Sequence, residues 1–520
     1  MPGALFSRLN RSFGAPPTIP ERRTGALQKI ETAAVQYPLR LETVAEVVPK
    51  MSDKSVIVIG AGFAGLTAGW WLATHGFDVT VLEARTRVGG RVHTKRADRR
   101  VLECGGELIG RNHANWLRLA SYFDLGLSPI TTEENYAAER LKSPMYLAGE
   151  PITVGDQEAL YDEMRIALKR LDPMAAKVDA LTPWLSELQD KDNESVEKWL
   201  NELGDEVSPR TKTALRFQLE CDQTVPVDRQ SLLGLLAAVS GGSLTDLSDP
   251  RRQEPSEFWT ETEVYRCAGG NDQLAYRLKT EIEERGGRVL LSTPASKITL
   301  GSNDVRVCAN GKDYIGDWVV VAVPPSCWDR MEFPFKTEPY RITMGPAFKF
   351  LAGTKKRFWM RDSLSPNGTD DHFGMVWEGT DNEDDSRGEP ELTVFAGGPA
   401  SNGVQNPANP DPYFRAGLEK LYKGFGNEVE NTIPVNWTTQ EWTMAGYSCP
   451  TVCQVTTAAR HLYEPCGRLV WAGEHTCMAF FGYMEAALQS GMHAAQLIAE
   501  KEGIPEVQRI CEVRARDFGS

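Results

Sequence analysis

The first clear pattern along the chain is a short apolar run, Ser55-Val-Ile-Val-Ile59, which predicts a buried parallel strand. A helical pattern follows over residues 66–75, and Gly76 is well placed to end that helix. The next apolar run, residues 78–82, predicts a second strand that closes with Glu83. These three elements form a βαβ unit of about thirty residues.

Helical and strand-like patterns continue along the rest of the chain. Residues 156–235 carry Leu and Ala at helical spacing with few glycines, and residues 273–285 predict another amphipathic helix. Strand-like runs follow at residues 288–291, 304–308 and 318–323. The mixture predicts a protein with both helices and sheets, built around a parallel βαβ core.

Composition narrows the class of partner. The 520 residues include 57 Lys+Arg and 71 Asp+Glu, a formal charge of −14, which argues against nucleic acid or an anionic membrane as a partner. The sequence has no run of about 18 apolar residues and no apolar core of a secretory signal near its start. The ten cysteines are scattered without metal-ligand spacing, so no metal is expected. We therefore expect a soluble cytoplasmic protein.

Glycines occupy the turn between the first strand and the helix, in the sequence Gly60-Ala-Gly-Phe-Ala-Gly65. Their position and spacing match the dinucleotide-binding fingerprint: Gly60 permits the tight turn, Gly62 lets a pyrophosphate approach the backbone, and Gly65 lets the helix pack on the strand. The helix N-terminus then favours the anion. Glu83 is expected to accept hydrogen bonds from the ribose hydroxyls, and its charge disfavours a 2′-phosphate, so NADP is not expected.

A second glycine pair, Gly89-Gly90, is followed by Arg91, which gives another close approach to phosphate with a guanidinium to pair with it. The run of residues 83–92 resembles the signature of the flavin-containing amine oxidase superfamily, which includes monoamine oxidases, polyamine oxidases and L-amino acid oxidases. The resemblance implies FAD as the cofactor.

Four further segments resemble the superfamily in the right order, so that the resemblance covers nearly all of residues 53–500. They are residues 102–110, similar to the segment beneath the flavin ring; residues 269–273 with 288–289 and 294–295, similar to the segment that holds the adenosine half; residues 321–325, similar to a returning strand; and residues 469–474 with 482–491, similar to the C-terminal flavin motif. In the last of these, the helix over residues 483–499 should direct its N-terminus at the flavin, and the resemblance implies that Glu474 hydrogen-bonds the ribityl–phosphate region.

The resemblance also implies the cofactor contacts and the domain organisation. The cofactor-binding residues would be Gly60, Gly62, Gly65, Glu83, Ala84, Arg85, Gly89, Gly90, Arg91, Gly105, Gly106, Glu107, Ala295, Trp442, Gly473, Glu474, Gly482, Tyr483 and Met484. The expected fold is α/β and α+β, with a Rossmann-like FAD-binding domain and a substrate domain that has a mixed sheet and a helical insertion. Its parts would be an N-terminal extension (1–52), three FAD-binding segments (53–120, 264–330 and 441–505), a mainly helical insertion (121–263), the substrate-domain sheet (331–440) and a tail (506–520).

Lys349 ends the run Gly345-Pro-Ala-Phe-Lys349 inside an otherwise apolar strand. A lysine in such a strand is costly unless its ammonium has a partner. The superfamily places a lysine here, bridged by water to flavin N5, where hydride arrives and oxygen later reacts. We therefore expect Lys349 to be catalytic.

Aromatic residues are expected around the substrate. Tyr483 matches the C-terminal tyrosine of the aromatic cage of monoamine oxidases, which stacks around the substrate amine and guides it to the flavin. Trp442 and Tyr447 match superfamily positions and are further candidates for substrate contact, although core aromatic residues are common.

The opposite wall of the cage departs from the monoamine oxidases. Those enzymes carry a Cys–Tyr pair whose cysteine is the covalent flavin attachment, and our alignment puts Thr451 and Val452 at that pair. Cys449 and Cys453 each lie two residues from the attachment position. The sequence therefore predicts non-covalent FAD and half of the cage.

Carboxylate recognition is the feature that would indicate an amino-acid substrate. In snake-venom-type L-amino acid oxidases an arginine binds the substrate carboxylate, and the aligned residue here is Leu108, with Arg111 three residues on as a substitute or as a surface residue. Glu107 is unusual in this apolar segment and can hold an ammonium group or cap the following turn.

Our leading hypothesis from the sequence is an FAD-dependent L-amino acid oxidase that transfers hydride from the α carbon to flavin N5 and uses oxygen to give keto acid, ammonia and hydrogen peroxide. It is favoured by the absence of a C-terminal membrane anchor, the helical insertion and the loss of the covalent cysteine. A soluble monoamine or polyamine oxidase is the alternative, and a flavin-binding interaction protein without turnover is a second one. The superfamily commonly forms dimers, so a homodimer is expected.

Overall fold

The structure is a computed structural model that describes residues 52–97, 100–242, 258–382, 390–404 and 409–504. The N-terminal extension expected for residues 1–52 lies, apart from Ser52, outside the described residues, as does the tail expected for 506–520. Among the described helices, none has the length and apolar character needed to cross a membrane.

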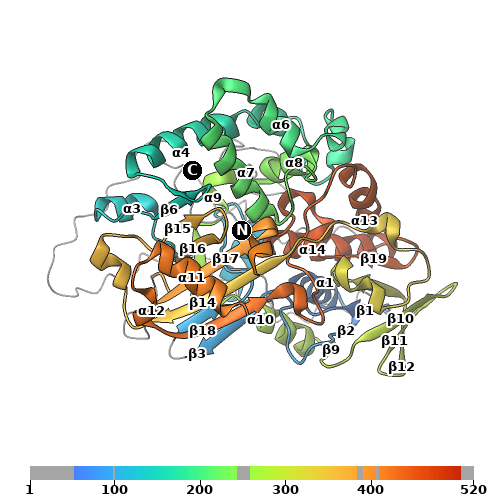
Figure 1. Cartoon of the computed structure of the whole chain (residues 1–520). Coiled ribbons are helices and arrows are strands. Elements are labelled where there is room, and N and C mark those ends of the chain that lie inside the picture. Colours follow the sequence, from blue (N-terminus) through green and yellow to red (C-terminus); the bar gives the residue numbers. More distant parts are fainter. Residues whose placement is uncertain (1–51, 98–99, 243–257, 383–389, 405–408, 505–520) are drawn as a thin grey trace, which may run out of the picture.

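A five-stranded parallel sheet forms the centre of the first half of the molecule (Figure 1). Its strand order is β19 (Leu469–Trp471), β13 (Trp318–Val321), β1 (Ser55–Ile59), β2 (Asp78–Leu82) and β9 (Arg288–Leu290). Helices α1 (Phe63–Thr74), α10 (Asp272–Glu284) and α14 (Met484–Lys501) pack with this sheet in one apolar core. The expected βαβ unit and the strands expected near 288 and 318 are therefore confirmed, with α1 beginning three residues earlier than the pattern predicted.

Three smaller pairings flank this sheet. An antiparallel sheet contains β10 (Ala295–Leu300), β11 (Val305–Ala309) and β12 (Lys312–Gly316). Two two-stranded pairs are formed by β3 (Thr94–Ala97) with β4 (Arg100–Glu103), and by β5 (Leu127–Pro129) with β8 (Tyr265–Cys267). The second pair brings together the two ends of the mainly helical segment that lies between β5 and β8 in the sequence.

A seven-stranded mixed sheet forms the second half of the molecule. Its order is β18 (Val429–Asn436), β14 (Ala347–Thr354), β17 (Glu391–Gly397), β16 (Gly374–Glu378), β15 (Gly368–Asp370), β6 (Met145–Leu147) and β7 (Glu150–Pro151). All eight residues of β14 are buried, and this strand carries Lys349 between Phe395 of β17 and Val435 of β18. The lysine expected in an apolar strand therefore lies in the interior of a sheet and not at its edge.

Helices cover one side of this sheet (Figure 1). They include α4 (Val154–Lys169), α6 (Val196–Glu202), α7 (Pro209–Gln223) and α8 (Leu232–Gly242). Helix α8 is buried on all sides, as expected for a helix that is apolar around its whole circumference. The other α-helices of the described residues are α2 (Ala114–Tyr122), α3 (Glu133–Ala138), α5 (Asp172–Ala175), α9 (Phe258–Glu261), α11 (Asp411–Leu421), α12 (Phe425–Glu428) and α13 (Arg460–Tyr463).

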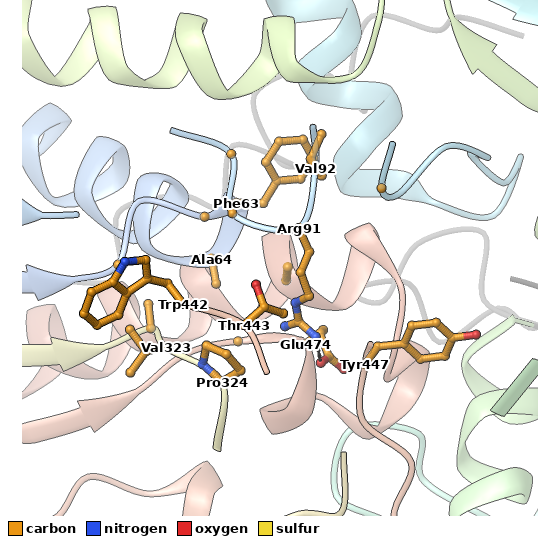
Figure 2. Close-up of a pocket in the computed structure, with 18 of the residues that line it drawn as sticks. Phe63, Ala64, Arg91, Val92, Val323, Pro324, Trp442, Thr443, Tyr447 and Glu474 are labelled. Atoms are coloured by element: carbon orange, nitrogen blue, oxygen red, sulfur yellow. Dashed lines mark hydrogen bonds and ion pairs between the residues drawn. The ribbon is translucent and has the colours of Figure 1, made fainter. Parts of the chain in front are cut away.

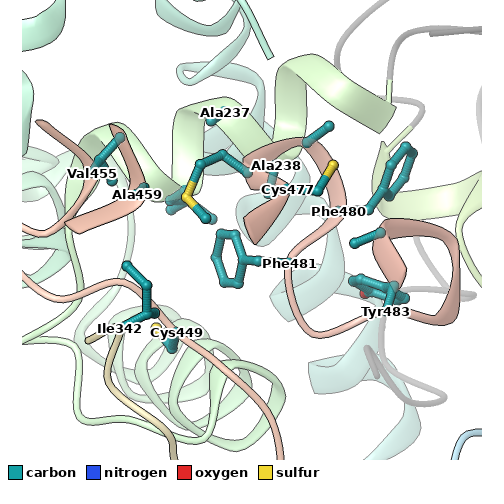
Figure 3. Close-up of a cluster of buried hydrophobic side chains, with 14 of the residues drawn as sticks. Ala237, Ala238, Ile342, Cys449, Val455, Ala459, Cys477, Phe480, Phe481 and Tyr483 are labelled. Atoms are coloured by element: carbon teal, nitrogen blue, oxygen red, sulfur yellow. The ribbon is translucent and has the colours of Figure 1, made fainter. Parts of the chain in front are cut away.

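The helical segment is joined to the rest of the molecule through α8. Figure 3 shows Ala237 and Ala238 of α8 facing Cys477 and Phe480, which lie just before α14. A Cβ on Gly241 would come within 2.4 Å of the Ala479 carbonyl oxygen, so α8 approaches this loop as closely as backbone atoms allow. The loop leads directly into Tyr483, so α8 positions one wall of the cavity described below.

Candidate active site

One elongated cavity of about 1550 Å³, mouth included, runs between the parallel sheet and the seven-stranded sheet. Its lining comes from the β1–α1 turn, the end of β2, the 89–92 and 105–108 loops, strand β14 and the start of α14. Figure 2 shows Trp442 at one end of the view and Tyr447 at the other, with Arg91 and Glu474 between them.

The glycine turn lies at the wall of this cavity. A Cβ on Gly65 would lie 2.0 Å from the Gly60 carbonyl oxygen, so a side chain there would push α1 away from the turn. A Cβ on Gly62, in contrast, would meet no protein atom closer than the Gly90 Cα at 3.9 Å. Packing therefore explains the glycine at position 65, whereas free space for a ligand explains the one at position 62. Gly65 itself does not line the cavity, and its role as a cofactor contact stays a prediction.

The Glu83 carboxylate is fixed by two backbone donors: the Ala61 N–H at 2.7 Å and the Arg85 N–H at 2.8 Å. Each of its oxygens accepts one of these bonds and keeps a lone pair for a ligand hydroxyl. Thr293 N–H donates to the Glu83 carbonyl at 2.7 Å and thereby brings the neighbouring Ala295 to the cavity wall. The structure thus places an oriented carboxylate where the sequence predicted recognition of a ribose.

Arg91 and Glu474 form the middle of the cavity floor (Figure 2). Arg91 Nη1 donates to Glu474 at 2.7 Å and to the Gly446 carbonyl at 3.0 Å. Glu474 also accepts from the Ser448 hydroxyl and from the backbone N–H groups of Ser448 and Gly482. Burial acts to raise the pKa of Glu474, but the charge of Arg91, the His475 ring and the hydrogen bonds from Ser448 and Arg91 together hold that pKa below its usual value.

Glu474 also connects several parts of the cavity wall. Its carboxylate receives four donors from the protein, so it ties the 446–448 loop and the turn before α14 to Arg91. These contacts orient Arg91 and the N-terminus of α14 toward the cavity. The expected hydrogen bond from Glu474 to the cofactor stays a prediction.

Two tyrosines close the cavity at the other end. Tyr447 donates its hydroxyl to the Asp222 carbonyl at 2.6 Å, and its ring stacks on Phe395 at 6.4 Å. Tyr483 precedes α14 and lies 5.5 Å from the ring of His113. Burial, followed by the negative charges of Glu263 and Asp222, raises the pKa of both tyrosines well above its usual value. Both phenols are therefore neutral at physiological pH.

This pair of tyrosines corrects our alignment of the second wall. The alignment placed Thr451 and Val452 there, but these two residues do not line the cavity. Thr451 bridges to Gln230, and the Val452 N–H donates to the Arg229 carbonyl at 3.0 Å, so the chain has already left the cavity at this point. The wall is made by Gly446 and Tyr447, and its aromatic residue is retained.

Arg111 lies outside the cavity. Its side chain is 59% exposed and forms an ion pair with Glu261, and its Nε lies 3.5 Å from the Tyr265 hydroxyl. The Arg111 N–H donates to the Glu261 carbonyl, and this bond directs the residue to the surface, whereas Leu108 does line the cavity. The structure therefore does not place Arg111 where it could bind a substrate carboxylate.

The remaining expected residues line the cavity: Gly60, Gly62, Glu83, Ala84, Arg85, Gly89, Gly90, Arg91, Gly105, Gly106, Glu107, Leu108, Ala295, Lys349, Trp442, Tyr447, Gly473, Glu474, Gly482, Tyr483 and Met484. Sequence reasoning missed several others: Phe63, Val92, Val323, Cys327, Arg330, Phe395, Trp437 and Thr443. Phe63, Val92 and Val323 lie within segments that the sequence already singled out, and Phe395 lies in an apolar strand that pairs with the one holding Lys349.

The fold and the cavity define a dinucleotide-dependent oxidoreductase, with the nucleotide at the β1–α1 turn and a buried lysine and two tyrosines at the other end. The chain belongs to the family of flavin-containing amine oxidoreductases, whose model matches residues 63–499. A model of pyridine nucleotide-disulphide oxidoreductases also matches residues 12–105, which include the βαβ unit.

Individual relatives are distant in sequence but nearly complete in coverage. A probable flavin-containing monoamine oxidase A from Dictyostelium discoideum is 24% identical over 86% of this chain and 97% of the relative. A putrescine oxidase from Kocuria rosea is 27% identical over 85% of this chain and 94% of the relative. A solved structure of putrescine oxidase bound to putrescine superposes with a TM-score of 0.74 at 21% identity, covering 86% of this chain and 99% of that one.

FAD is the cofactor of this family, and the residues present fit it. The open cradle at Gly62 and Gly90, the fixed Glu83 carboxylate and the N-termini of α1 and α14 all face one cavity. Among the described lining residues the cysteine is Cys327, whereas Cys449 and Cys453 do not line the cavity. These positions agree with FAD that is held without a covalent link.

We expect acid precipitation of the purified protein to release its flavin. The reason is that Gly446 and Tyr447, rather than a cysteine, form the wall beside the turn before α14. The measurement is the 450 nm absorbance of the supernatant against that of the pellet after trichloroacetic acid treatment. The expectation would be contradicted if the yellow colour stayed with the precipitate of the wild-type protein but was released from a Cys327→Ser variant.

Proposed function

We propose that the protein is an amine oxidase acting on a monoamine or polyamine, with FAD and molecular oxygen as co-reactants. A primary amine and oxygen would give an imine and hydrogen peroxide, and water would then hydrolyse the imine to an aldehyde and ammonia. The observation that carries this proposal is the chemistry of the tyrosine end of the cavity, where acidic side chains lie behind the tyrosines and Arg111 is absent.

The surroundings of the tyrosines favour an amine over a carboxylate. Asp222 and Glu263 are both buried behind the tyrosines, and burial raises the pKa of Glu263 well above its usual value, which disfavours its charged form. The described cations that line the cavity already have partners within the protein: Arg85, Arg91, Arg330 and Lys349. An amine can therefore lie against the tyrosine rings at this end, whereas a carboxylate would be buried beside acidic groups and without a free cation, which is costly.

The names of the relatives support the same reading. They are called monoamine oxidase and putrescine oxidase, and both cover most of this chain. Arg111 was the residue that we considered for binding the carboxylate of an amino acid, and its side chain lies at the surface. We therefore place the amine ahead of the amino acid as substrate.

The residues would share the work as follows. Tyr447 and Tyr483 bracket the substrate and exclude water, so that the amine nitrogen and its α carbon are aligned. Bound FAD supplies the hydride acceptor. Lys349 holds a proton and a positive charge at the cavity floor beside the loop of residues 103–107. The N-terminus of α14 adds a favourable field for negative charge at the same floor.

Matched pairs of substrates test the proposal in a peroxide-coupled assay. Phenethylamine, tyramine and putrescine should each exceed phenylalanine, tyrosine and ornithine in kcat/KM by about tenfold or more, because only the amino acids carry a carboxylate. A preference for the amino acids would overturn the proposal in favour of an L-amino acid oxidase. Anaerobic mixing that leaves the flavin oxidised with every substrate would favour a protein without turnover.

Replacing Arg111 by alanine should leave KM for the best substrate unchanged within about twofold, because its exposed ion pair with Glu261 makes only a weak contribution. Steady-state kinetics with the wild type and the variant provide the measurement. An increase of tenfold or more, restricted to carboxylate-bearing substrates, would bring Arg111 back into the site.

A further inference from the structure

The Lys349 ammonium uses all of its hydrogen-bond donors on the protein. The residue is 1% exposed, and its Nζ donates to the Glu103 carbonyl at 2.7 Å, to the Gly105 carbonyl at 3.2 Å and to the Glu107 carboxylate. An ammonium group has three N–H donors. Each of them has an acceptor, so the orientation of the charged end is fully determined by the 103–107 loop.

Glu107 is held from its other side as well. Its Oε1 accepts from Trp377 Nε1 at 3.1 Å and forms an ion pair with Arg266 Nε at 3.2 Å, and Glu107 is 1% exposed. Lys349 Nζ also lies 5.5 Å from the centroid of the Trp377 ring. Burial acts to raise the pKa of Glu107, but the charges of Lys349 and Arg266 outweigh burial and hold that pKa below its usual value.

These contacts form a closed group of two cations and one carboxylate, with a net charge of +1, beneath the cavity floor. Both Lys349 and Glu107 also line the cavity, so the charge of the group faces the cofactor. A buried ion pair of this kind gives no net stability as a rule, and a well-packed apolar pair would serve the fold as well. The presence of this charged group beside the cavity therefore points to a role for the charge itself.

We propose that Glu107 is the positioning residue of Lys349: its carboxylate compensates the buried charge of the ammonium group and holds that group in one orientation. This inference rests on the proposed function only for its use in amine oxidation, because the charge and orientation of the lysine are properties of the resting protein. Glu107 thereby has a role that the sequence could only present as a choice between binding an ammonium and capping a turn.

Removing the carboxylate should change the protonation of the lysine. In a Glu107→Gln variant, Lys349 and Arg266 are two buried cations with no anion between them, and the ammonium should release its proton at a lower pH. The other titratable or charged groups that act on Lys349 or lie beside it come from the 103–104 segment, the chain before β8, β8 and β17: Glu103, Cys104, Glu263, Arg266 and Glu391.

Two of these neighbours titrate in the accessible range and must be separated from the lysine. Burial raises the pKa of Glu103 to about 7 and that of Glu391 to about 8. The diagnostic signal is therefore an ionisation that appears in Glu107→Gln and disappears when Lys349→Met is added. Glu391→Gln is a matched control, because it removes a buried carboxyl near Lys349 that does not line the cavity.

The experiment is a pH titration, from pH 6 to 10, of the visible spectrum of the FAD-bound full-length protein without substrate. Glu107→Gln should show an additional step between about pH 7 and 9 that the wild type, Glu391→Gln and the double variant lack. Glu107→Asp keeps the charge but shortens the side chain, so its step should appear within the titrated range at a higher pH than the step of Glu107→Gln. This variant also decides the question if the glutamine variant binds no FAD.

Two results would overturn the inference: a Glu107→Gln profile equal to that of the wild type, or a step that remains in the double variant. If FAD-bound Glu107→Asp is the only usable variant, the absence of any new step in it likewise overturns the inference. Because no amine is added, the titration gives an answer even if the protein oxidises no amine. Failure of this inference can therefore be distinguished from failure of the proposed function.

Discussion

Replacing Lys349 by methionine is expected to lower kcat/KM for the best amine by roughly 100- to 1,000-fold. The ammonium is the only charged group that β14 brings to the cavity floor, and methionine keeps the apolar stem while removing the charge. Glu107 keeps Arg266 as an ion-pair partner, so the fold should survive the change. Anaerobic stopped-flow measurement of flavin reduction, followed by reoxidation with oxygenated buffer, would show which half-reaction slows.

Lys355→Met is the matched control for this prediction. Lys355 follows the same strand by one residue and is exposed, with its Nζ donating to the Asn427 carbonyl at 3.0 Å. The Lys355→Met variant should react at the wild-type rate in both half-reactions. If Lys349→Met itself reacts at wild-type rates in both half-reactions, a catalytic role for the buried lysine is refuted.

The second large effect concerns the cofactor. Gly62→Ala should weaken FAD binding by roughly 100- to 1,000-fold, because its Cβ would occupy the space left between the turn and Gly90 and would push the pyrophosphate away from the N-terminus of α1. The thermal stability of the apoprotein should not change, since that Cβ meets no protein atom within 3.9 Å. Flavin fluorescence titration and calorimetry of the apoprotein would measure the two quantities.

Gly65→Ala is expected to behave in the opposite way. Its Cβ would lie 2.0 Å from the Gly60 carbonyl oxygen, so the apoprotein should lose about 1–3 kcal/mol of unfolding free energy even without FAD. If the two variants lose apoprotein stability equally, packing also explains the glycine at position 62. The interpretation of the space at Gly62 as room for a ligand would then be wrong.

Much of the cofactor half of the molecule could be predicted from the sequence, because its signals are local. The βαβ unit, the glycine spacing and Glu83 all lie within residues 55–83, where neighbours in sequence are neighbours in space. Lys349 was also predictable, since a single charged residue in an eight-residue buried strand needs a partner.

The substrate half was harder, because its contacts join distant segments through loops. The partner of Lys349 is 242 residues away, and no periodicity links the two. The aligned position of the carboxylate-binding arginine was Leu108, and Arg111 was considered as a substitute three residues on. The chain turns at Gly110, where its N–H donates to His113 Nδ1, and Arg111 lies outside the cavity. In the 446–453 loop, our alignment differed by five residues and put Thr451 and Val452 in place of Gly446 and Tyr447, because irregular backbone offers no pattern that fixes the alignment.

The helical segment also differed from expectation in one respect. Residues 121–263 were expected to be mainly helical, yet they contribute β5 to a pair with β8 and add β6 and β7 to the edge of the seven-stranded sheet. These strands are two or three residues long, too short for a period-two pattern to be recognised.

Those short strands pair residues 121–263 with the rest of the polypeptide, and this pairing limits which parts can be exchanged between relatives. A hybrid joined at residues 121 and 263 would separate β5 from β8 and β6 from β15, and would open the edge of the sheet whose interior carries Lys349. Junctions placed after Pro151 and before Phe258 would leave both pairings in one parent. Engineers who wish to transplant a new specificity should therefore treat the helices alone as the interchangeable cassette.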